Sequence, residues 1–190
     1  MIDNTNETRV LQSPTGFCYW LTGLPGAGKS TIASATTRRF EEAGYRVLHL
    51  DADDLRAGLN VDLGFSRRDR AENVRRISEV ALMLTERGFI VLVSAIAPYR
   101  VDRDAVRARF QPGRYVETFV STPFEMCVAR DPKGLYAKAR RREIHGLTGW
   151  DDPYETPSEP ELIISTDMQS VRSAVDQIFH HYESLNHACG

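Results

Sequence analysis

The chain has 190 residues and a mass of 21.4 kDa, which suits one domain better than two. Its 42% of hydrophobic and 26% of charged residues are typical of a globular protein with a buried core. The 24 Lys and Arg against 26 Asp and Glu give a net charge of −2, which argues against nucleic acid or an anionic membrane as a partner.

The amino-terminal residues are polar, and we expect residues 1–15 to form a tail outside a single domain over residues 16–190. They show neither the basic start nor the apolar stretch of a secretory signal, and no apolar run approaches the roughly 20 residues of a membrane helix. Three cysteines and five histidines show no disulfide or metal-ligand spacing, so His49 is expected to be a strand residue without a catalytic role. The sequence therefore predicts a cytoplasmic protein.

Expected strands and helices alternate along the chain. The expected strands are apolar and cover residues 17–21, 46–50, 89–97, 114–121 and 162–165. Helices are expected over residues 31–43, 67–87, 101–110 and 171–185, with two short helices within 123–144. Such apolar strands, alternating with helices, predict an α/β domain of three layers, in which a five-stranded parallel sheet carries helices on both faces.

A glycine-rich segment follows the first expected strand and opens the first expected helix. Residues 23–31 read GLPGAGKST and match the P-loop pattern G-x-x-x-x-G-K-[ST]. In this pattern backbone amides surround phosphate oxygens, the Lys29 ammonium reaches the β- and γ-phosphates, and the Ser30 hydroxyl binds Mg²⁺. We therefore expect ATP and Mg²⁺ as cofactors. The expected ATP-binding residues here are Gly23, Leu24, Pro25, Gly26, Ala27, Gly28, Lys29, Ser30 and Thr31.

Acidic residues follow the second expected strand. Asp51, Asp53 and Asp54 stand at its carboxyl end, where parallel sheets place their active sites. One carboxylate can join the Mg²⁺ shell while another accepts the proton of an acceptor hydroxyl; a solvated acidic turn that starts the next helix is the alternative. The expected catalytic residues are therefore Lys29, Asp51 and Asp53, and the expected metal ligands are Ser30 and Asp51.

Two further groups of polar residues are candidates for anion binding. Arg56 follows the acidic residues, and Arg70 and Asn73 lie one helical turn apart, so both can face one ligand. Residues 130–142 hold six basic residues against one acid, which usually indicates a solvated helix face. In a phosphotransferase, such a segment is also a candidate lid over the transferring phosphoryl group, and we place this lid at about residues 130–160.

Taken together, these motifs resemble the adenylyl-sulfate kinases, P-loop kinases that phosphorylate the ribose 3′-hydroxyl of adenylyl sulfate. The resemblance spans about residues 16–165 and rests on GLPGAGKST, LDADDLRAGLNVDLGFS, DRAENVRR, RDPKGLYAKAR and GLTGWDDPYETPSEPEL. It implies a P-loop NTPase fold and a transfer of the ATP γ-phosphate that yields 3′-phosphoadenylyl sulfate and ADP in sulfate assimilation. It places Arg130 beside the ATP base. The substrate-binding residues that it implies are Asp53, Arg56, Phe65, Arg70, Asn73, Ile96, Ala97, Lys133 and Leu147.

The resemblance also assigns roles within that set and shows departures from the family. It makes Phe65 one face of a clamp on the substrate adenine and Lys133 a contact to the nucleotide substrates. Leu147 stands where the family commonly has phenylalanine, the second face of the clamp. Base–aromatic stacking is worth about 1–3 kcal/mol in nucleic-acid complexes, so the loss of one ring matters, and Trp150 is a candidate replacement. Ala97 stands where the family usually has serine, which excludes a hydroxyl role there.

Three alternatives stay open. A kinase of the same fold could act on another modified nucleotide, such as a cytidine diphosphoramidate, and Leu147 motivates this reading. A regulatory P-loop NTPase would not need the pocket of Arg56, Arg70 and Asn73, and an inactive binding module would not need Lys29. The expected partner is a small-molecule nucleotide, while a homodimer, common in that family, and a functional association with an ATP sulfurylase are left open.

Overall fold

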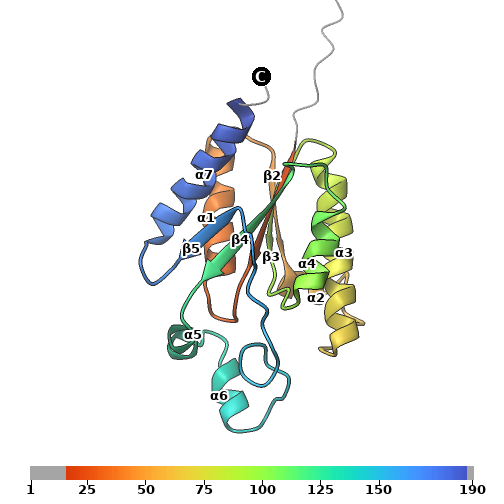
Figure 1. The fold of residues 1–190 in the computed structure, drawn as a ribbon, viewed down its shortest axis with the longest axis vertical. Helices are drawn as coiled ribbons and strands as arrows, with labels where there is room; N and C mark the ends of the chain where they lie inside the picture. The colour runs from red at the N-terminus through yellow and green to blue at the C-terminus, as the bar shows by residue number, and fades with distance from the viewer. Residues whose placement is uncertain (1–15, 188–190) are drawn as a thin grey trace, which may run out of the picture.

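The computed structural model describes residues 16–187, so the expected tail over residues 1–15 lies outside the described part. Five strands form one sheet in the order β2-β3-β1-β4-β5, and neighbouring strands are parallel (Figure 1). The strands are β1 (Phe17–Thr22), β2 (Val47–Asp51), β3 (Ile90–Ser94), β4 (Tyr115–Ser121) and β5 (Leu162–Ser165). The five-stranded parallel sheet predicted from the apolar strands is confirmed.

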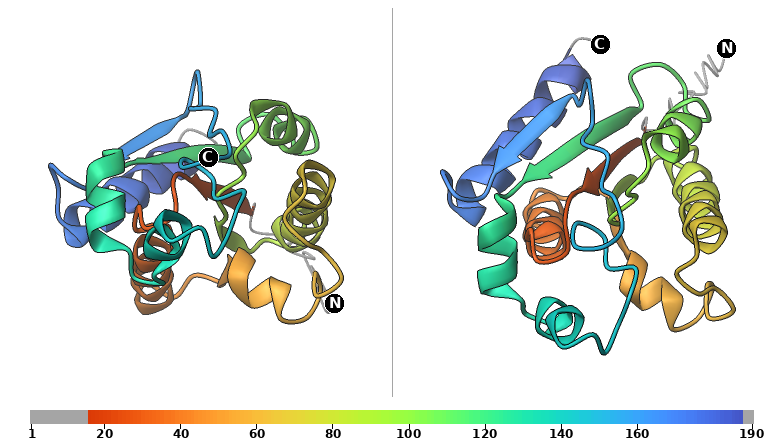
Figure 2. Two further views of the ribbon diagram at one scale, coloured as in Figure 1. Left: turned by 90° about the horizontal axis from the view of Figure 1, so that it is seen from below. Right: turned by 60° about the horizontal axis from the view of Figure 1, so that its bottom comes forward.

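Four longer helices cover the two faces of the sheet. On one face α1 (Lys29–Glu42) packs beside α7 (Val171–His187). On the other face α3 (Arg67–Thr85) packs beside α4 (Arg100–Arg107), and both views of Figure 2 show the sheet between the two pairs. This is the predicted three-layer arrangement. No helix within residues 16–187 has the length and apolar character that a membrane crossing requires.

Side chains of the central strand β1 alternate between two apolar cores. Phe17, Tyr19 and Leu21 are buried in the core under α1 and α7. Cys18 and Trp20 are buried in the core under α3 and α4. Successive side chains of a strand point to opposite faces, so a strand that is apolar at every position needs cover on both sides.

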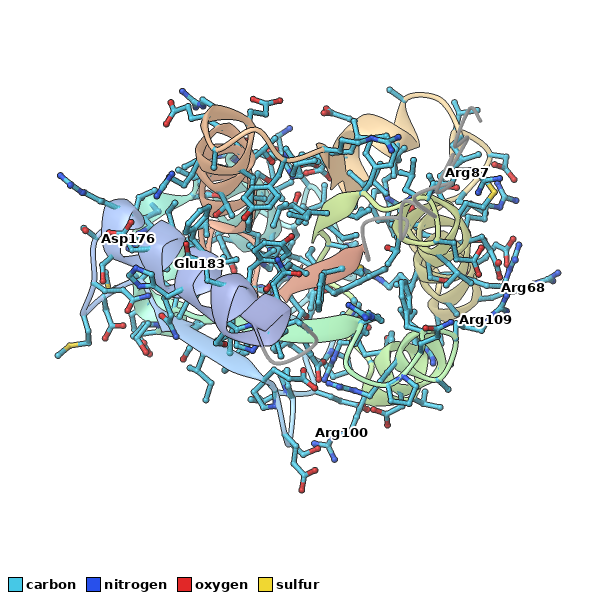
Figure 3. The ribbon with its side chains drawn as sticks, turned by 90° about the horizontal axis from the view of Figure 1, so that it is seen from above. Arg68, Arg87, Arg100, Arg109, Asp176 and Glu183 are labelled. Atoms are coloured by element: carbon cyan, nitrogen blue, oxygen red, sulfur yellow. The ribbon has the colours of Figure 1, made fainter. Side chains whose placement is uncertain are left out.

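Helix α3 also buries its apolar side chains against the sheet, here at the spacing of a helix. Val74, Ile77 and Ala81 are buried against the sheet, as the predicted apolar stripe requires. The opposite side of this layer is charged, and Figure 3 shows Arg68 and Arg109 at the periphery of the molecule beside α3 and α4. Hydrophobic burial therefore fixes which side of the helix faces the sheet.

Three short helices lie beyond the carboxyl ends of the strands (Figure 2). They are α2 (Ala52–Arg56), α5 (Phe124–Arg130) and α6 (Leu135–Arg140). The pair α5 and α6 was predicted, whereas α2 was not, because five residues are too few to show an apolar period. Asp51 caps α2 by accepting a hydrogen bond from the Asp53 backbone amide, so the acidic turn does start a helix.

The expected strand over residues 89–97 is wrong at its end. Strand β3 stops at Ser94, and residues 95–98 continue as an irregular turn. Ala97 has a φ of 42°, a left-handed conformation that lies outside the extended region of a regular strand. The apolar sequence therefore predicted burial of this segment correctly but not its backbone conformation.

Candidate active site

A cavity of about 630 Å³ opens at the carboxyl end of the sheet. Its wall comes from the loop after β1, from α2 and α3, from the 95–98 turn, and from residues around 130–136 and 166–174. Most of the expected site residues line it, namely Pro25, Gly26, Ala27, Gly28, Lys29, Ser30, Thr31, Asp53, Arg56, Phe65, Arg70, Asn73, Ile96, Ala97, Arg130 and Lys133. The expected residues that are not part of this wall are Gly23, Leu24, Asp51 and Leu147.

The loop between β1 and α1 has the shape of a phosphate cradle. Gly26 and Gly28 adopt left-handed φ angles of 76° and 104°, which glycine takes without steric strain. Helix α1 begins directly afterwards at Lys29, so its positive end points into the loop. The fold thus provides the backbone amides and the helix terminus that the sequence motif predicts.

Lys29 is buried at the base of this loop. Its Nζ donates hydrogen bonds to the carbonyl oxygens of Gly23 at 3.0 Å and Leu24 at 2.8 Å. Burial lowers the pKa of Lys29 to about 8, and the negative charge of Asp53 opposes this shift. The ammonium is therefore held in the P-loop, and its charge is easier to remove than that of an exposed lysine.

Asp51 lies beside the P-loop serine. Its carboxylate accepts hydrogen bonds from the Ser94 hydroxyl at 2.7 Å and from the Asp53 amide at 2.9 Å. Burial acts to raise the pKa of Asp51, but hydrogen bonds from Ser30, Ser94 and Asp53 outweigh burial, so the pKa is lowered. The carboxylate stays ionised next to the Ser30 hydroxyl.

The pair of Ser30 and Asp51 has the donor chemistry that Mg²⁺ requires. A hydroxyl and a carboxylate are hard oxygen ligands, which Mg²⁺ prefers to nitrogen or sulfur. Within residues 16–187, no group of three or more His, Cys, Asp or Glu is placed to hold a metal ion. An ion at Ser30 and Asp51 would therefore complete its shell with nucleotide phosphates and water.

Sequence reasoning missed Ser94, which donates a hydrogen bond to Asp51, and the contact of His49 with that serine. Ser94 is the register partner of Asp51 on β3, and its hydroxyl also lies 2.8 Å from Nε2 of His49. The other ring nitrogen of His49 lies 3.4 Å from the Ser34 hydroxyl of α1. A serine that ends an apolar strand was the signal for Ser94, but its pairing with Asp51 depends on the register between β2 and β3.

Asp53 faces a basic residue of the lid segment (residues 130–160). Its carboxylate forms an ion pair with the Lys133 ammonium, which lies between α5 and α6. The hydrogen bond to Asp53 is the main reason why the pKa of Lys133 is raised. The structure thus joins two expected site residues that are 80 positions apart.

Arg56, Phe65 and Arg70 form one cluster on the wall. The Arg56 guanidinium carbon lies 4.5 Å from the centroid of the Phe65 ring, and its Nη1 donates to the carbonyls of Leu63 and Gly64 at 3.1 Å each. Arg70 donates from Nε to the Phe65 carbonyl at 3.0 Å. The aromatic ring and the two cations are therefore fixed relative to each other.

The buried side of this cluster connects to the lid segment and to the loop after α2. Arg70 donates from Nη2 to the carbonyl of Gly146 at 2.5 Å. Asn73 accepts a hydrogen bond of 3.0 Å from Nδ2 of Asn60. Arg70 and Asn73 lie one helical turn apart on the cavity side of α3, as the sequence predicted, and these contacts fix their side chains.

Arg130 lies at the opposite side of the P-loop. It donates to the hydroxyl of Thr166 at 2.9 Å and to the Thr166 carbonyl at 3.0 Å. The end of α5 is therefore tied to the segment that follows β5, and both line the cavity.

Leu147 and Trp150 are not among the residues that line the cavity, although Gly146, next to Leu147, accepts a hydrogen bond from Arg70 of the wall. Leu147 is only 8% exposed and belongs to the buried apolar cluster that extends from the sheet to Tyr136 and Ala139 of α6. The Trp150 ring lies 6.2 Å from the Phe124 ring and 6.4 Å from the Tyr136 ring, measured between centroids. Burial of Leu147 removes apolar surface from water, and the Trp150 ring packs with its aromatic neighbours.

Comparison with known proteins identifies the family. The sequence model of the family described as "Adenylylsulphate kinase" matches residues 15–165. An adenylyl-sulfate kinase of Lactiplantibacillus plantarum is 47% identical over 184 residues, which cover 94% of this chain and 89% of the relative. The bifunctional enzyme NodQ of Azospirillum brasilense is 46% identical over 175 residues, or 92% of this chain and 28% of NodQ.

A solved structure agrees with this result. The APS kinase of Mycobacterium tuberculosis in complex with AMPPNP and APS superposes with a TM-score of 0.86 at 44% sequence identity. The match covers 90% of this chain and 99% of that one. With the P-loop, the parallel sheet and most of the expected site residues in place, the chain belongs to the adenylylsulphate kinase family.

Proposed function

We propose that the protein is an adenylyl-sulfate kinase that transfers the γ-phosphate of ATP to the ribose 3′-hydroxyl of adenylyl sulfate. The products are 3′-phosphoadenylyl sulfate and ADP. One observation carries this proposal: a single cavity joins a P-loop to the cluster of Arg56, Phe65 and Arg70, with Asp53 on the same wall. Membership of the family supports the choice of acceptor, because the related structure holds AMPPNP together with APS.

The two sets of site residues follow from this reading. ATP would bind to the P-loop over residues 23–31, with its base beside Arg130. Adenylyl sulfate would lie against Phe65, with its anionic groups and sugar bound by the set of Arg56, Arg70, Asn73, Ile96, Ala97 and Lys133. We also propose one domain over residues 16–190, with the lid over about 130–160.

The two acidic residues take different roles in this proposal. Asp51 accepts a hydrogen bond from Ser30, which lines the cavity, and this position suits a ligand in the Mg²⁺ shell. Asp53 lines the cavity, which suits a base that accepts the proton of the ribose hydroxyl. When bound, Mg²⁺ would supply charge neutralisation at the β- and γ-phosphates.

The remaining charges stabilise the transferring group. Lys29 would neutralise the β- and γ-phosphates, and Lys133 would add a positive charge from the lid. Transfer would be direct and in line, without a covalent intermediate on the protein. The chain's contribution is then to position two nucleotides and to exclude water.

The alternatives lose their support. A cytidine-based acceptor was motivated by Leu147 alone, whereas the adenylyl-sulfate kinase relatives and the related structure with APS favour adenylyl sulfate. A regulatory NTPase would not need Arg56, Arg70 and Asn73 on the cavity wall, yet all three line it. A cytoplasmic location, a homodimer and a functional association with an ATP sulfurylase stay predictions, which fractionation, light scattering and co-purification would test.

An ADP-release assay tests the proposed reaction. Purified protein receives ATP, Mg²⁺ and one of three additions: adenylyl sulfate, a cytidine diphosphoramidate, or no acceptor. We expect ADP release with adenylyl sulfate to exceed release with either alternative by at least tenfold, together with the appearance of 3′-phosphoadenylyl sulfate. A tenfold preference for the cytidine compound, or equal ADP release without an acceptor, would contradict the proposal.

A further inference from the structure

The 95–98 turn borders the cavity and is held by donors from three different elements. The carbonyl of Ile96 accepts a hydrogen bond of 2.6 Å from the Thr22 hydroxyl of β1. The carbonyl of Ala97 accepts one of 2.7 Å from Nη1 of Arg103 in α4. The carbonyl of Pro98 accepts one of 2.8 Å from the backbone amide of Glu155 in the lid segment. Three consecutive carbonyls therefore each depend on a distant part of the chain.

Ala97 explains why the turn needs these bonds. Its φ of 42° lies in the left-handed region, which an alanine occupies at a steric penalty. A residue keeps such a strained backbone conformation only where contacts with the surrounding structure hold it there. Ile96 and Ala97 also line the cavity, so the backbone that needs support is part of the acceptor site proposed above.

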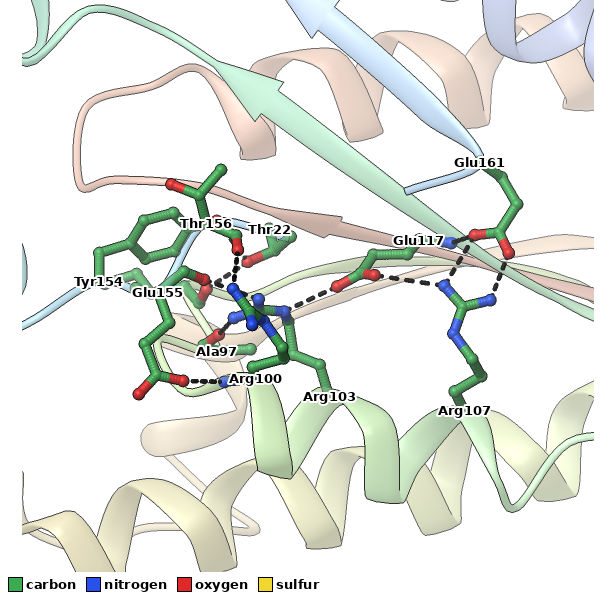
Figure 4. A network of polar contacts seen from close by, with 11 residues as sticks. Thr22, Ala97, Arg100, Arg103, Arg107, Glu117, Tyr154, Glu155, Thr156 and Glu161 are labelled. Atoms are coloured by element: carbon green, nitrogen blue, oxygen red, sulfur yellow. Dashed lines mark hydrogen bonds and ion pairs between the residues drawn. The ribbon is translucent and has the colours of Figure 1, made fainter. Parts of the chain in front are cut away.

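Arg103 supplies that support from inside the protein (Figure 4). It is 1% exposed, and it donates 2.7 Å hydrogen bonds from Nε to Glu117, from Nη1 to Ala97 and from Nη2 to the carbonyl of Glu155. A guanidinium is planar and rigid, so fixing one edge on the buried Glu117 carboxylate also fixes the directions of the other two bonds.

Glu155 completes the connection between the turn and the lid. Its amide donates to the carbonyl of Pro98. Its carbonyl accepts from Arg103, and its carboxylate accepts from the Arg100 amide at 2.6 Å (Figure 4). The carboxyl-terminal part of the lid segment is thus attached to the same turn that borders the acceptor site. Movement of either segment would strain the other through Arg103.

We propose that Arg103 is a positioning residue for acceptor binding, which holds the 95–98 turn and Glu155 of the lid as one unit. The proposal rests on the function proposed above, because that function makes the cavity wall at Ile96 and Ala97 part of the acceptor site. It requires no contact between Arg103 and either nucleotide. Its consequence is a selective effect on the acceptor, because the P-loop receives no hydrogen bond from Arg103.

The chain offers a matched control in Arg107, one turn along the same helix. Arg107 pairs with Glu117 and Glu161 but makes no hydrogen bond to the 95–98 turn or to Glu155. Removing either guanidinium therefore takes a cation from Glu117, whereas only Arg103→Met releases Ala97 and Glu155. Melting temperatures of both variants measure the general loss of stability, and the remaining measurements isolate the positioning effect.

The test compares wild type, Arg103→Met and Arg107→Met by steady-state kinetics and by hydrogen exchange of the peptide containing Glu155. For Arg103→Met we expect the KM for adenylyl sulfate to rise at least tenfold, the KM for ATP to change less than twofold, and the Glu155 amide to exchange at least tenfold faster. For Arg107→Met we expect all three values within twofold of wild type. Unchanged acceptor KM and exchange in Arg103→Met would overturn the proposal.

Two further arms keep the result decisive. If Arg103→Met does not fold, Arg103→Lys replaces it, because the lysine keeps a charge beside Glu117 but lacks the planar fork. An acceptor KM and Glu155 exchange rate within twofold of wild type in Arg103→Lys would then overturn the proposal. If wild type does not act on adenylyl sulfate, the proposed function fails, while the exchange measurement still tests the attachment of Glu155 by Arg103.

Discussion

Lys133 of the lid forms an ion pair with Asp53 of α2 across the cavity. The two side chains are 57% and 64% exposed, so water and salt screen the pair. Exposed ion pairs contribute about 0–1 kcal/mol, which is too little to hold a lid closed. The contact is therefore easily exchanged, so a bound acceptor can replace either partner.

We expect Lys133→Ala to impair catalysis without destabilising the protein. The lost charge would otherwise stabilise the transferring phosphoryl group, so kcat/KM for adenylyl sulfate should fall at least tenfold. Lys138→Ala is the control, because Lys138 is an exposed lid lysine of α6 that does not line the cavity. Steady-state kinetics measure kcat/KM of both variants for adenylyl sulfate. An equal fall in both would mean that the total positive charge of the lid, and not the position of Lys133, is what the reaction needs.

Neutralising the two acidic residues should separate their roles. Asp53→Asn should lower kcat at least a hundredfold with nucleotide affinity within threefold, because a base acts in the reaction rather than in binding. Asp51→Asn should instead raise the Mg²⁺ concentration that gives half-maximal rate. Asp54→Asn is the matched control, since Asp54 is exposed on the same short helix and off the cavity wall. Near-normal rates in both test variants would place the catalytic carboxylate elsewhere.

The lowered pKa of Lys29 predicts a pH dependence of ATP binding. Burial sets this pKa to about 8, so the free protein loses the charge as the pH rises through 8, whereas bound phosphates favour the charged form. Affinity for AMPPNP should therefore be highest below pH 8 and fall by up to about tenfold per pH unit above it. Calorimetry in buffers of different ionisation enthalpy should also show proton uptake on binding.

Two Lys29 variants serve as controls for that titration. The guanidinium of Lys29→Arg keeps its charge at every pH in this range. The affinity of this variant for AMPPNP should therefore not fall between pH 8 and 9.5 because of a lost charge at residue 29. Lys29→Ala should reduce turnover more than tenfold, because the charge on the transferring phosphoryl group loses its partner. A wild-type affinity that is constant from pH 7 to 9.5 would show that Lys29 does not titrate there.

Leu147→Phe should affect stability rather than acceptor choice. Leu147 is buried in an apolar cluster, and inserting a larger side chain into a packed core typically costs about 1–3 kcal/mol. Denaturant unfolding measures that loss, and kcat/KM for adenylyl sulfate and for a cytidine diphosphoramidate should stay within threefold. A lower KM for adenylyl sulfate at unchanged stability would instead show that residue 147 contacts the base.

Much of the site could be predicted from the sequence because its signals are local. The P-loop needs glycines, Lys29 and Ser30 at fixed neighbouring positions between a strand and a helix, and that pattern is complete within residues 23–31. Parallel strands place their carboxyl ends at one edge, so Asp51 and Asp53 were expected at the same edge as the P-loop. The apolar strands and the stripe on α3 likewise predicted two covered faces.

The tertiary structure decided the pairings between distant segments. The register between β2 and β3 places Ser94 beside Asp51, and the path of the lid places Lys133 at Asp53 and buries Leu147. None of these contacts leaves a periodic or adjacent pattern in the chain. They depend on strand register and on the packing of the lid segment, which arise only when segments far apart in sequence are buried together.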